Sequence, residues 1–243
     1  MGHGTPDWGQ TSGAQTVYQL TDLAELAVRL GSIVSFDRRG DVIWLDDFEE
    51  GIIKWATEVS GAAGAVTADT SRARNGAVSV KVVAGLTEGQ ESGIQKSLPF
   101  VALSPFGFEV SASLPSADFY LRLRLVVYTG TAWYEAAIRY WSPTTTFQYL
   151  DSSGVWQNLA PVYGVGAGAA MWNSFKLVAD FTTFKYVRFI ANGRTYLLTG
   201  LALQTGASST TPSIFVAAKL SAANAVAVSA YLDDVIITQN EPV

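Results

Sequence analysis

The sequence predicts an all-β protein, built as an antiparallel β-sandwich. Two nearly identical aromatic-Leu-Asp-Asp segments, Trp44–Asp47 and Tyr231–Asp234, stand near opposite ends of a long series of short alternating stretches. Alternation of apolar and polar residues is typical of strands that bury one face, and no strand–helix–strand rhythm accompanies it. We therefore expect the two segments to be the first and last strands of one closed sandwich, paired or adjacent, with their carboxylates at one edge.

Residues 1–43 are predicted to form an attachment region ahead of the sandwich, which we assign to residues 44–243. Residues 1–19 are rich in Gly, Thr, Gln and Ser and show no periodicity. This composition fits either a disordered tail or an extended arm that lies on a neighbouring subunit. For an arm, the isolated aromatics Trp8 and Tyr18 are the candidate interface residues, because buried aromatic side chains anchor interfaces.

One short helix and a β-hairpin complete this region. Thr21 is a suitable N-cap, and Gly31 ends the apolar stripe that follows it. Ser32–Phe36 and Val42–Phe48 then flank Asp37–Gly40, which has the composition of a hairpin turn. A helix of about ten residues is too short to be stable alone, so we expect it to pack on the sandwich or on a partner.

The sandwich is predicted from alternating strands with turn residues between them. Phe106–Leu114 alternates apolar residues with Gly, Glu and Ser, which predicts one buried side and one side in contact with solvent. Asn192 and Gly193 form a strong two-residue hairpin signal, and Thr205–Pro212 is predicted to be a loop. In chain order, the predicted strands are residues 78–82, 106–114, 119–128, 133–141, 147–150, 155–159, 172–181, 186–190, 195–198, 214–220 and 226–238.

The strands at 119–128 and 133–141 share a face that is rich in aromatic and charged residues. Flat rings stack on the apolar side of a pyranose and forked polar groups bind its hydroxyls, so this face is a candidate glycan site. The alternative is that another layer or subunit covers the face, with arginines stacked on the rings. The candidate ligand-binding or interface residues are Tyr120, Arg122, Arg124, Trp133, Glu135, Arg139 and Trp141.

A low content of charge constrains the partners of this protein. Charged residues are 15% of the chain, against about 25% in ordinary soluble domains, so its surface is expected to be unusually neutral. Interface cores are depleted in charge, so this composition favours self-association or an assembly over a low-charge monomer, which composition alone also allows. The net charge of -5 and the lack of a basic run argue against nucleic acid as a partner.

The absence of certain residue types and sequence segments argues against several kinds of catalytic site and against membrane insertion. The chain has no Cys, and its one His is His3, so thiolate chemistry, zinc sites and imidazole catalysis are not expected. No run of about 18 apolar residues occurs, so membrane insertion is not expected. A basic segment followed by an apolar one is absent from the N-terminus, so we expect no signal peptide. If the protein acts outside a cell, we expect it to leave by lysis or as part of a particle.

Several motifs resemble the jelly rolls of calcium-dependent carbohydrate-binding modules and of the concanavalin A-like lectin and glucanase group. Asp47–Gly51, Ser71–Val82 and Leu232–Val235 follow the pattern of such modules. Trp172–Leu177, followed by Asn192 and Gly193, is similar to a strand and hairpin of the lectin group. The resemblance covers the chain from about residue 44 to residue 238 and implies a jelly-roll β-sandwich.

The resemblance also implies a structural calcium ion. In the resembling modules this ion joins the first strand, the loop after it and the last strand, which correspond here to Asp47, Glu49, Asn75 and Asp234. A hard cation with about six to eight oxygen ligands would connect both ends of the sandwich. The alternative is that these side chains only end strands in solvent, since neither dense carboxylate spacing nor an EF-hand pattern is present.

Catalysis is not expected. The lectin-group glycosidases that the chain resembles carry Glu-x-Asp-x-x-Glu on one strand, and this spacing is absent here, as are P-loop, dinucleotide and serine hydrolase fingerprints. Residues 1–43 resemble the attachment region of phage virion proteins. The preferred hypothesis is therefore a non-catalytic virion surface component, a capsid decoration or tail-associated protein, assembled in the cytoplasm and located on the particle surface. The alternative is a carbohydrate-binding module or adhesin that uses the polar-aromatic face.

Overall fold

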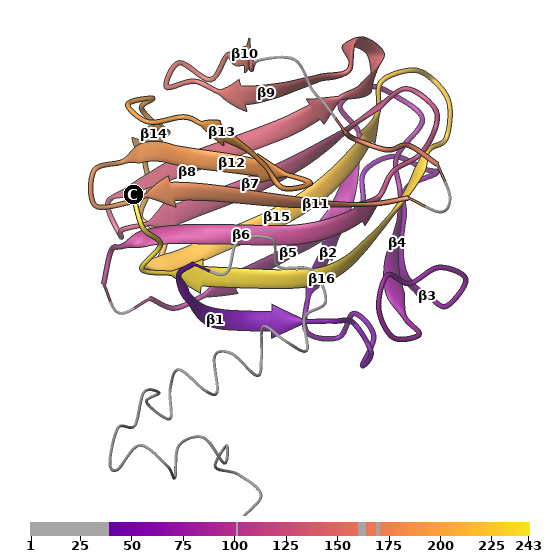
Figure 1. The fold of residues 1–243 in the computed structure, drawn as a ribbon, viewed down its shortest axis with the longest axis horizontal. Coiled ribbons are helices and arrows are strands. Elements are labelled where there is room, and N and C mark those ends of the chain that lie inside the picture. The colour runs from indigo at the N-terminus through magenta and orange to yellow at the C-terminus, as the bar shows by residue number, and fades with distance from the viewer. Residues whose placement is uncertain (1–38, 101, 160–163, 169–170) are drawn as a thin grey trace, which may run out of the picture. The chain divides into compact units, whose positions relative to one another are not determined.

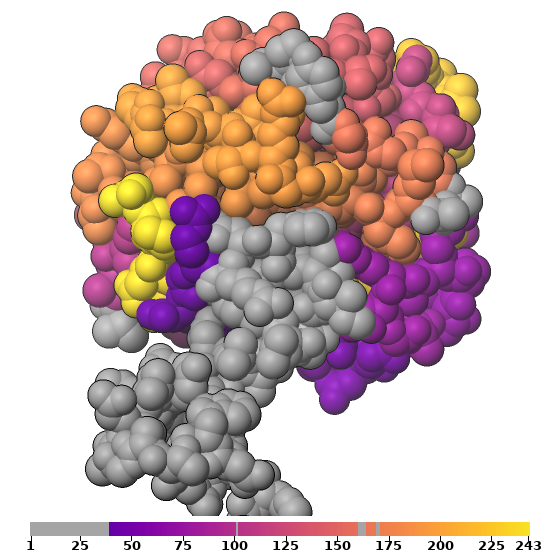
Figure 2. Space-filling view, viewed as in Figure 1, coloured from indigo at the N-terminus to yellow at the C-terminus, as the bar shows by residue number. Residues whose placement is uncertain are grey.

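The strands that carry the two aromatic-Leu-Asp-Asp segments pair with each other, which confirms the prediction. In the computed structural model, which describes residues 39–100, 102–159, 164–168 and 171–243, β1 (Asp41–Asp46) pairs antiparallel with β16 (Ser229–Gln239) (Figure 1). Asp46 stands opposite Val235 in this register. Figure 2 shows the C-terminal end, in yellow, against the start of the described chain, in indigo. The first and last strands therefore close the sandwich together.

Two antiparallel sheets of eight strands each pack face to face as a jelly-roll β-sandwich. The first sheet has the order β13-β12-β11-β6-β16-β4-β3, with β1 also paired to β16, and the second has the order β10-β9-β8-β7-β15-β5-β2, with β14 paired to β8. The other strands of the first sheet are β3 (Ala65–Asp69), β4 (Ser79–Val83), β6 (Pro105–Ser113), β11 (Trp172–Asp180), β12 (Lys185–Ala191) and β13 (Arg194–Leu197). The strands of the second sheet are β2 (Ala56–Glu58), β5 (Glu91–Leu98), β7 (Phe119–Tyr128), β8 (Ala132–Trp141), β9 (Thr146–Leu150), β10 (Trp156–Asn158), β14 (Gln204–Ala207) and β15 (Ser213–Ala222), and one 3-10 turn, η1 (Ser142–Thr144), follows β8.

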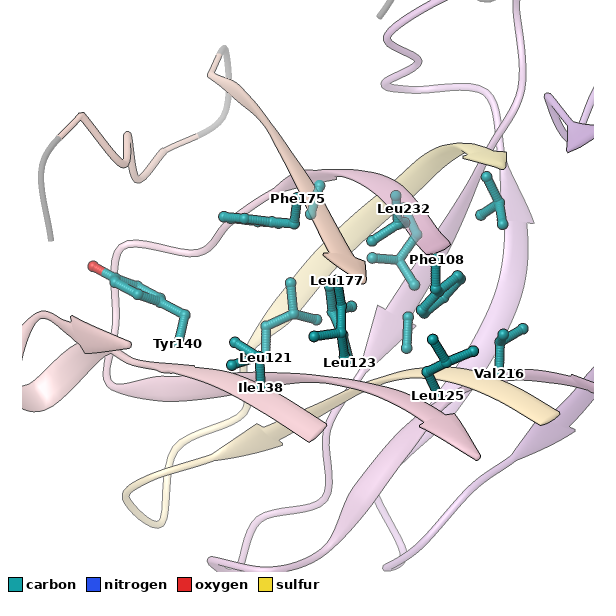
Figure 3. Close-up of a cluster of buried hydrophobic side chains, with 14 of the residues drawn as sticks. Phe108, Leu121, Leu123, Leu125, Ile138, Tyr140, Phe175, Leu177, Val216 and Leu232 are labelled. Atoms are coloured by element: carbon teal, nitrogen blue, oxygen red, sulfur yellow. The ribbon is translucent and has the colours of Figure 1, made fainter. Parts of the chain in front are cut away.

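Apolar side chains from the inner faces of both sheets form the core. Leu121, Leu123 and Leu125 project from β7 toward Phe175 and Leu177 of β11 (Figure 3). Each of these five side chains is at most 2% exposed. Full burial of one such side chain contributes about 1.5–3 kcal/mol to the free energy of folding, so this interior holds the two sheets together.

The outer side of β6 is buried, contrary to the prediction that it contacts solvent. Glu109 and Ser111 on that side are at most 3% exposed. Polar groups from distant parts of the chain cover it: Lys176 of β11 forms an ion pair with Glu241, and Arg74 donates a hydrogen bond to Ser111. The alternation predicted the strand and its apolar side correctly, but it did not predict that other residues bury the polar side.

Most of the predicted strands are confirmed. Asn192 (φ 47) and Gly193 (φ 83) make the predicted turn between β12 and β13, in the left-handed conformation that such hairpins require. Four strands were missed, β2, β3, β5 and β14, and β14 occupies the start of the predicted loop at 205–212. The proposed arm, the helix, the first hairpin strand and the interface residues Trp8 and Tyr18 lie outside the described residues.

Candidate functional site

The candidate ligand-binding residues lie on the outer face of the second sheet. The core takes alternate residues of β7 and β8, such as Leu121 and Ile138, so the residues between them point outward. Tyr120 stands opposite Trp141, and Arg122 stands opposite Arg139. All seven candidates are therefore on one face, as the alternation indicated.

A ring of aromatic side chains surrounds the guanidinium group of Arg139. The guanidinium carbon lies 4.4 Å from the ring centre of Trp156, 4.8 Å from that of Trp141 and 5.4 Å from that of Tyr120. Arg139 Nε donates a hydrogen bond of 2.6 Å to Gln148 Oε1 on β9. We call these five residues the Arg139 cluster. They combine flat apolar surfaces with polar groups that can reach the same ligand.

Burial changes the titration of two members of this cluster. It lowers the pKa of Arg139, because a partly buried cation loses hydration. It raises the pKa of the Tyr120 hydroxyl, and the Glu91 carboxylate adds to that rise. Tyr120 therefore stays neutral at physiological pH and acts as a packing and hydrogen-bonding group. Its ring stacks with that of Trp141 at a centre-to-centre distance of 5.8 Å.

Other charged side chains on this face are joined in ion pairs. Arg124 binds Glu135 with two hydrogen bonds, from Nε and Nη2, each 2.6 Å long. Lys219 Nζ of β15 lies 2.6 Å from Glu58 Oε2 of β2. Arg122 pairs with Glu91 of β5. These pairs involve five neighbouring strands of the sheet, β8, β7, β15, β5 and β2, and each of the three carboxylates binds a basic side chain.

The seven candidates do not form one site. Trp133 and Trp141 are at opposite ends of β8, about 26 Å apart at the rise of an extended strand. The Trp133 ring lies against the backbone of β14, where a Cβ on Gly206 would be 2.7 Å from Trp133 Nε1. Only Tyr120, Arg122, Arg139 and Trp141 fall at the end of the face where the aromatic rings gather.

Sequence reasoning missed two members of this cluster and one further residue on the same face. Trp156 stands opposite Leu150 in the hairpin of β9 and β10, and Gln148 stands opposite Arg139. Lys219 stands opposite Arg122. Lys219 shows the alternation of β15 and was recognisable as outward-facing, whereas no sequence signal places the β9–β10 hairpin beside β8.

The residues proposed as calcium ligands gather where the chain ends meet. Glu49 Oε1 accepts backbone hydrogen bonds from Ala77 (2.8 Å) and Val78 (2.9 Å), so it already caps the loop before β4. The Asp234 side chain is buried, and its Oδ2 has no hydrogen-bond partner. Burial raises the pKa of Asp234, and the charge of Asp47 adds to that rise against the charge of Arg74. Three distant segments therefore meet at this edge.

An arginine supplies the positive charge at this edge. The backbone amide of Arg74 donates a hydrogen bond of 2.7 Å to Asp233 Oδ2, and its guanidinium donates to Ser111 and Ser174. Burial raises the pKa of Asp233 to about 7, and the charge of Asp234 adds to the rise against the hydrogen bonds that Asp233 accepts.

Across the part of the chain that the structure describes, no group of three or more His, Cys, Asp or Glu residues is placed to hold a metal ion. Calcium also takes amide and backbone oxygens, such as those of Asn75, so the calcium site stays a prediction.

Asp234→Asn is expected to weaken the pH dependence of stability. The raised pKa of Asp233 means that the folded protein holds a proton that the unfolded chain releases, so stability is highest below the ordinary carboxyl pKa and falls as pH rises through about 7. Asparagine removes the neighbouring charge and tolerates the left-handed backbone of residue 234 (φ 47). From about pH 5 to pH 7.5, the variant should lose about 1 kcal/mol less free energy of unfolding than the parent protein. Urea denaturation at both pH values measures the difference.

This experiment has a matched control variant, and a second measurement tests whether calcium binds. Asp118→Asn changes an exposed carboxylate and should leave the parent pH dependence intact. Equal slopes in the parent and in Asp234→Asn would contradict the assigned coupling. If calcium binds at Asp234, the parent melts at a higher temperature in calcium than in a chelator and the variant does not respond. Equal melting of the parent protein in both solutions would contradict the calcium prediction.

One hollow of about 300 Å³ includes no member of the Arg139 cluster in its lining. It is lined by loop residues, among them Pro115, Gly168 and Ala227, with Arg72 as its charged side chain. The Arg72 guanidinium rests on the Tyr231 ring, 4.4 Å from its centre. One charged group and short side chains give this hollow few means to recognise a ligand, so we favour the Arg139 cluster as the site.

Comparison with known proteins shows the fold and no closer relationship. No family model matches the chain, and no curated protein matches it. A cellulose-induced protein has a TM-score of 0.56 and 18% identity, and the match covers 80% of this chain and 96% of that one. An endo-β-1,4-glucuronan lyase from the fungus Trichoderma reesei has a TM-score of 0.57 and 10% identity, with 82% and 95% of the two chains covered. A Bacillus subtilis protein with a galectin-like fold has a TM-score of 0.53 and 10% identity, with 83% and 97% covered.

At these identities the likeness establishes a shared jelly-roll fold alone. The match extends over nearly the whole of each neighbour, so the sandwich is a complete version of that fold. Within the described residues, no helix is long and apolar enough to cross a lipid bilayer. The named neighbours give no support to the predicted virion role.

Proposed function

We propose that the protein binds a carbohydrate on the outer face of its second sheet. The observation that carries this proposal is the Arg139 cluster, in which Trp141, Trp156 and Tyr120 surround a guanidinium group beside Gln148. Flat rings provide surface for the apolar side of a sugar, and the amide and guanidinium groups match its hydroxyls. Carbohydrate binding was the alternative hypothesis from the sequence, and we now prefer it to a virion role.

The fold supports a polysaccharide as the class of ligand. A glucuronan lyase shares the jelly roll, and its name identifies a polysaccharide as its substrate. The site lies on a sheet face that continues past Arg139 to Gln148 of β9 and Asn158 of β10, where Gln148 Nε2 donates 2.7 Å to Asn158 Oδ1. An extended polymer can follow this row of polar groups across the strands.

Binding without turnover is the form of activity that we propose. Retaining and inverting glycosidases need two carboxyl groups with separate acid and base or nucleophile roles. On this face, Glu91, Glu135 and Glu58 each bind a basic side chain, and those pairs hold the carboxylates away from such roles. We expect no new reducing ends and no unsaturated products when the protein is incubated with the polysaccharide that it binds.

Trp156→Ala is expected to weaken polysaccharide binding about tenfold or more, because it removes a ring that is partly exposed beside Arg139. Affinity electrophoresis through gels with and without soluble polysaccharides measures the change. Trp172→Ala is the matched control, because this partly exposed Trp is on β11 of the other sheet. The control should migrate as the parent protein does.

Two outcomes would overturn the proposal. Either the parent protein migrates equally in all gels of a panel of neutral and acidic polysaccharides, or Trp156→Ala and Trp172→Ala weaken binding equally. Self-association is the competing use of the face. If the parent is an oligomer in size-exclusion chromatography and Trp156→Ala is a monomer, the face is an interface between copies.

A further inference from the structure

Arg139 lacks the carboxylate partner that the other basic side chains of this face possess. Arg122, Arg124 and Lys219 each form an ion pair. Among the described residues Arg139 forms none, and its only hydrogen bond is the one from Nε to neutral Gln148. The Nη groups at the end of its fork are therefore available to a ligand.

The rings around Arg139 hold the cation without neutralising it. Trp156, Trp141 and Tyr120 attract a guanidinium through their ring faces, but they carry no charge of their own. Burial lowers the pKa of Arg139, while the charges of Glu88 and Glu91, neither of which forms an ion pair with it, raise that pKa. A desolvated cation without a counter-ion attracts an anion more strongly than an exposed one does, because water screens it less.

A second arginine stands directly across the strand pair. Arg122 is opposite Arg139 in the register of β7 and β8, and like charges in opposed positions destabilise a sheet. Arg122 is paired with Glu91 on one side, yet its Nε is buried and has no hydrogen-bond partner. A buried donor without an acceptor is costly, so both arginines gain from an acceptor placed beside them.

We propose that this face selects an acidic saccharide, whose carboxylate binds the free end of the Arg139 fork next to Arg122. The inference rests on the proposed carbohydrate binding and names its ligand class as uronic acid polymers. A planar carboxylate matches the two parallel donors of a guanidinium, while Trp141 and Trp156 contact the sugar ring. Neutral polymers lack the group that satisfies Arg139 and bind less tightly.

The test uses oligomers of glucuronate, galacturonate and mannuronate, each beside its carboxyl-reduced neutral counterpart, in isothermal titration calorimetry with the full chain. Carboxyl reduction changes the charge and leaves the backbone linkage intact. We expect at least one acidic oligomer to bind about tenfold or more tightly than its neutral counterpart, and this ratio to fall as salt increases.

Arg139→Gln should abolish the preference, because it lowers affinity for the acidic oligomer about tenfold more than affinity for the neutral one, which loses only hydroxyl contacts. Arg139→Lys keeps the charge without the fork and should retain only part of the preference. Arg72→Gln removes another ring-stacked arginine, outside this face, and should change neither affinity. Melting curves of each variant check that it is folded at the temperature of the titrations.

The outcomes separate this inference from the function on which it rests. Equal affinity of the parent for acidic and neutral counterparts overturns acid selectivity and leaves carbohydrate binding in place. An equal loss of both affinities in Arg139→Gln also overturns it. Binding of neither set, together with no retardation in the polysaccharide gels, overturns the proposed function itself.

Discussion

Replacing Glu241 with glutamine is expected to lower the free energy of unfolding by about 3–5 kcal/mol, because the change leaves two buried cations without their shared carboxylate. Glu241 Oε1 lies 2.7 Å from Lys176 Nζ, and Oε2 accepts a hydrogen bond from Arg188. The side chains of all three residues are at most 4% exposed. Glutamine has nearly the same shape, so the loss reports the charge rather than a cavity.

This carboxylate also fixes the C-terminal segment to the first sheet. The backbone amide of Glu241 donates 3.1 Å to the Pro105 carbonyl at the start of β6, and Arg188 donates to the Pro242 carbonyl. Thr238 adds a hydrogen bond to Oε1. Disruption of the pair therefore also loosens the end of β16, which pairs with β1.

Urea denaturation of parent and variant measures the effect, and Glu88→Gln is the control. Glu88 is exposed, so its substitution should change the free energy of unfolding by no more than about 0.5 kcal/mol. A Glu241→Gln variant that unfolds at the same urea concentration as Glu88→Gln would contradict the assigned role of the ion pairs.

The closure of the sandwich was predictable because both strands that form it carry the same local pattern. Trp44–Asp47 and Tyr231–Asp234 share an aromatic-Leu-Asp-Asp order, and β1 does pair with β16. Their acidic residues accept hydrogen bonds from different partners, which the shared pattern does not indicate. Asp46 accepts a hydrogen bond of 2.7 Å from the Trp55 indole, whereas Asp233 accepts from the backbone of the loop before β4.

Strands without an apolar alternation escaped prediction for identifiable reasons. β5 contains Gly93, where a Cβ would lie 2.1 Å from the carbonyl oxygen of Ala218, so the backbone of β15 approaches too closely for a side chain. β14 contains Gly206 under the Trp133 ring. Glycine inside a strand signals a close approach as readily as a turn, and the sequence favoured a loop at β14 and gave no strand signal at β5.

The sequence predicted which face of the sheet carries the candidate site, but not which residues belong to the site. Alternation along β7 and β8 put Arg122, Arg139 and Trp141 on one side correctly. Whether a given aromatic residue reaches Arg139 depends on the hairpin that adds β9 and β10 to the sheet, and that neighbour relation is set by register across strands. This is why Trp156 was missed and why Trp133, at the far end of β8, was included.

Tyr186→Phe is expected to lower the free energy of unfolding by about 2–3 kcal/mol, because it leaves a buried backbone amide of the site strand without a partner. Two short strands share the outer edge of β8: β14 pairs with residues 132–135 and β9 with residues 138–141. The Tyr186 hydroxyl, from β12 of the opposite sheet, fills the gap between them. It accepts from the Ala137 amide (2.9 Å) and donates to the Leu150 carbonyl (2.8 Å), with the Ala137 carbonyl at 3.2 Å.

This hydroxyl stays protonated over the working range of the protein, because burial raises the pKa of Tyr186 far above its ordinary value. Its loss should therefore have the same effect at about pH 5 and about pH 8, in contrast to the effect of Asp234→Asn. Urea denaturation at both pH values measures this, with Tyr128→Phe as the control, because Tyr128 is partly exposed at the end of β7. A loss no greater than that of the control would show that β8 keeps its backbone geometry without Tyr186. A full loss, with weaker polysaccharide binding by the folded variant, would show that the first sheet positions the strand that carries Arg139.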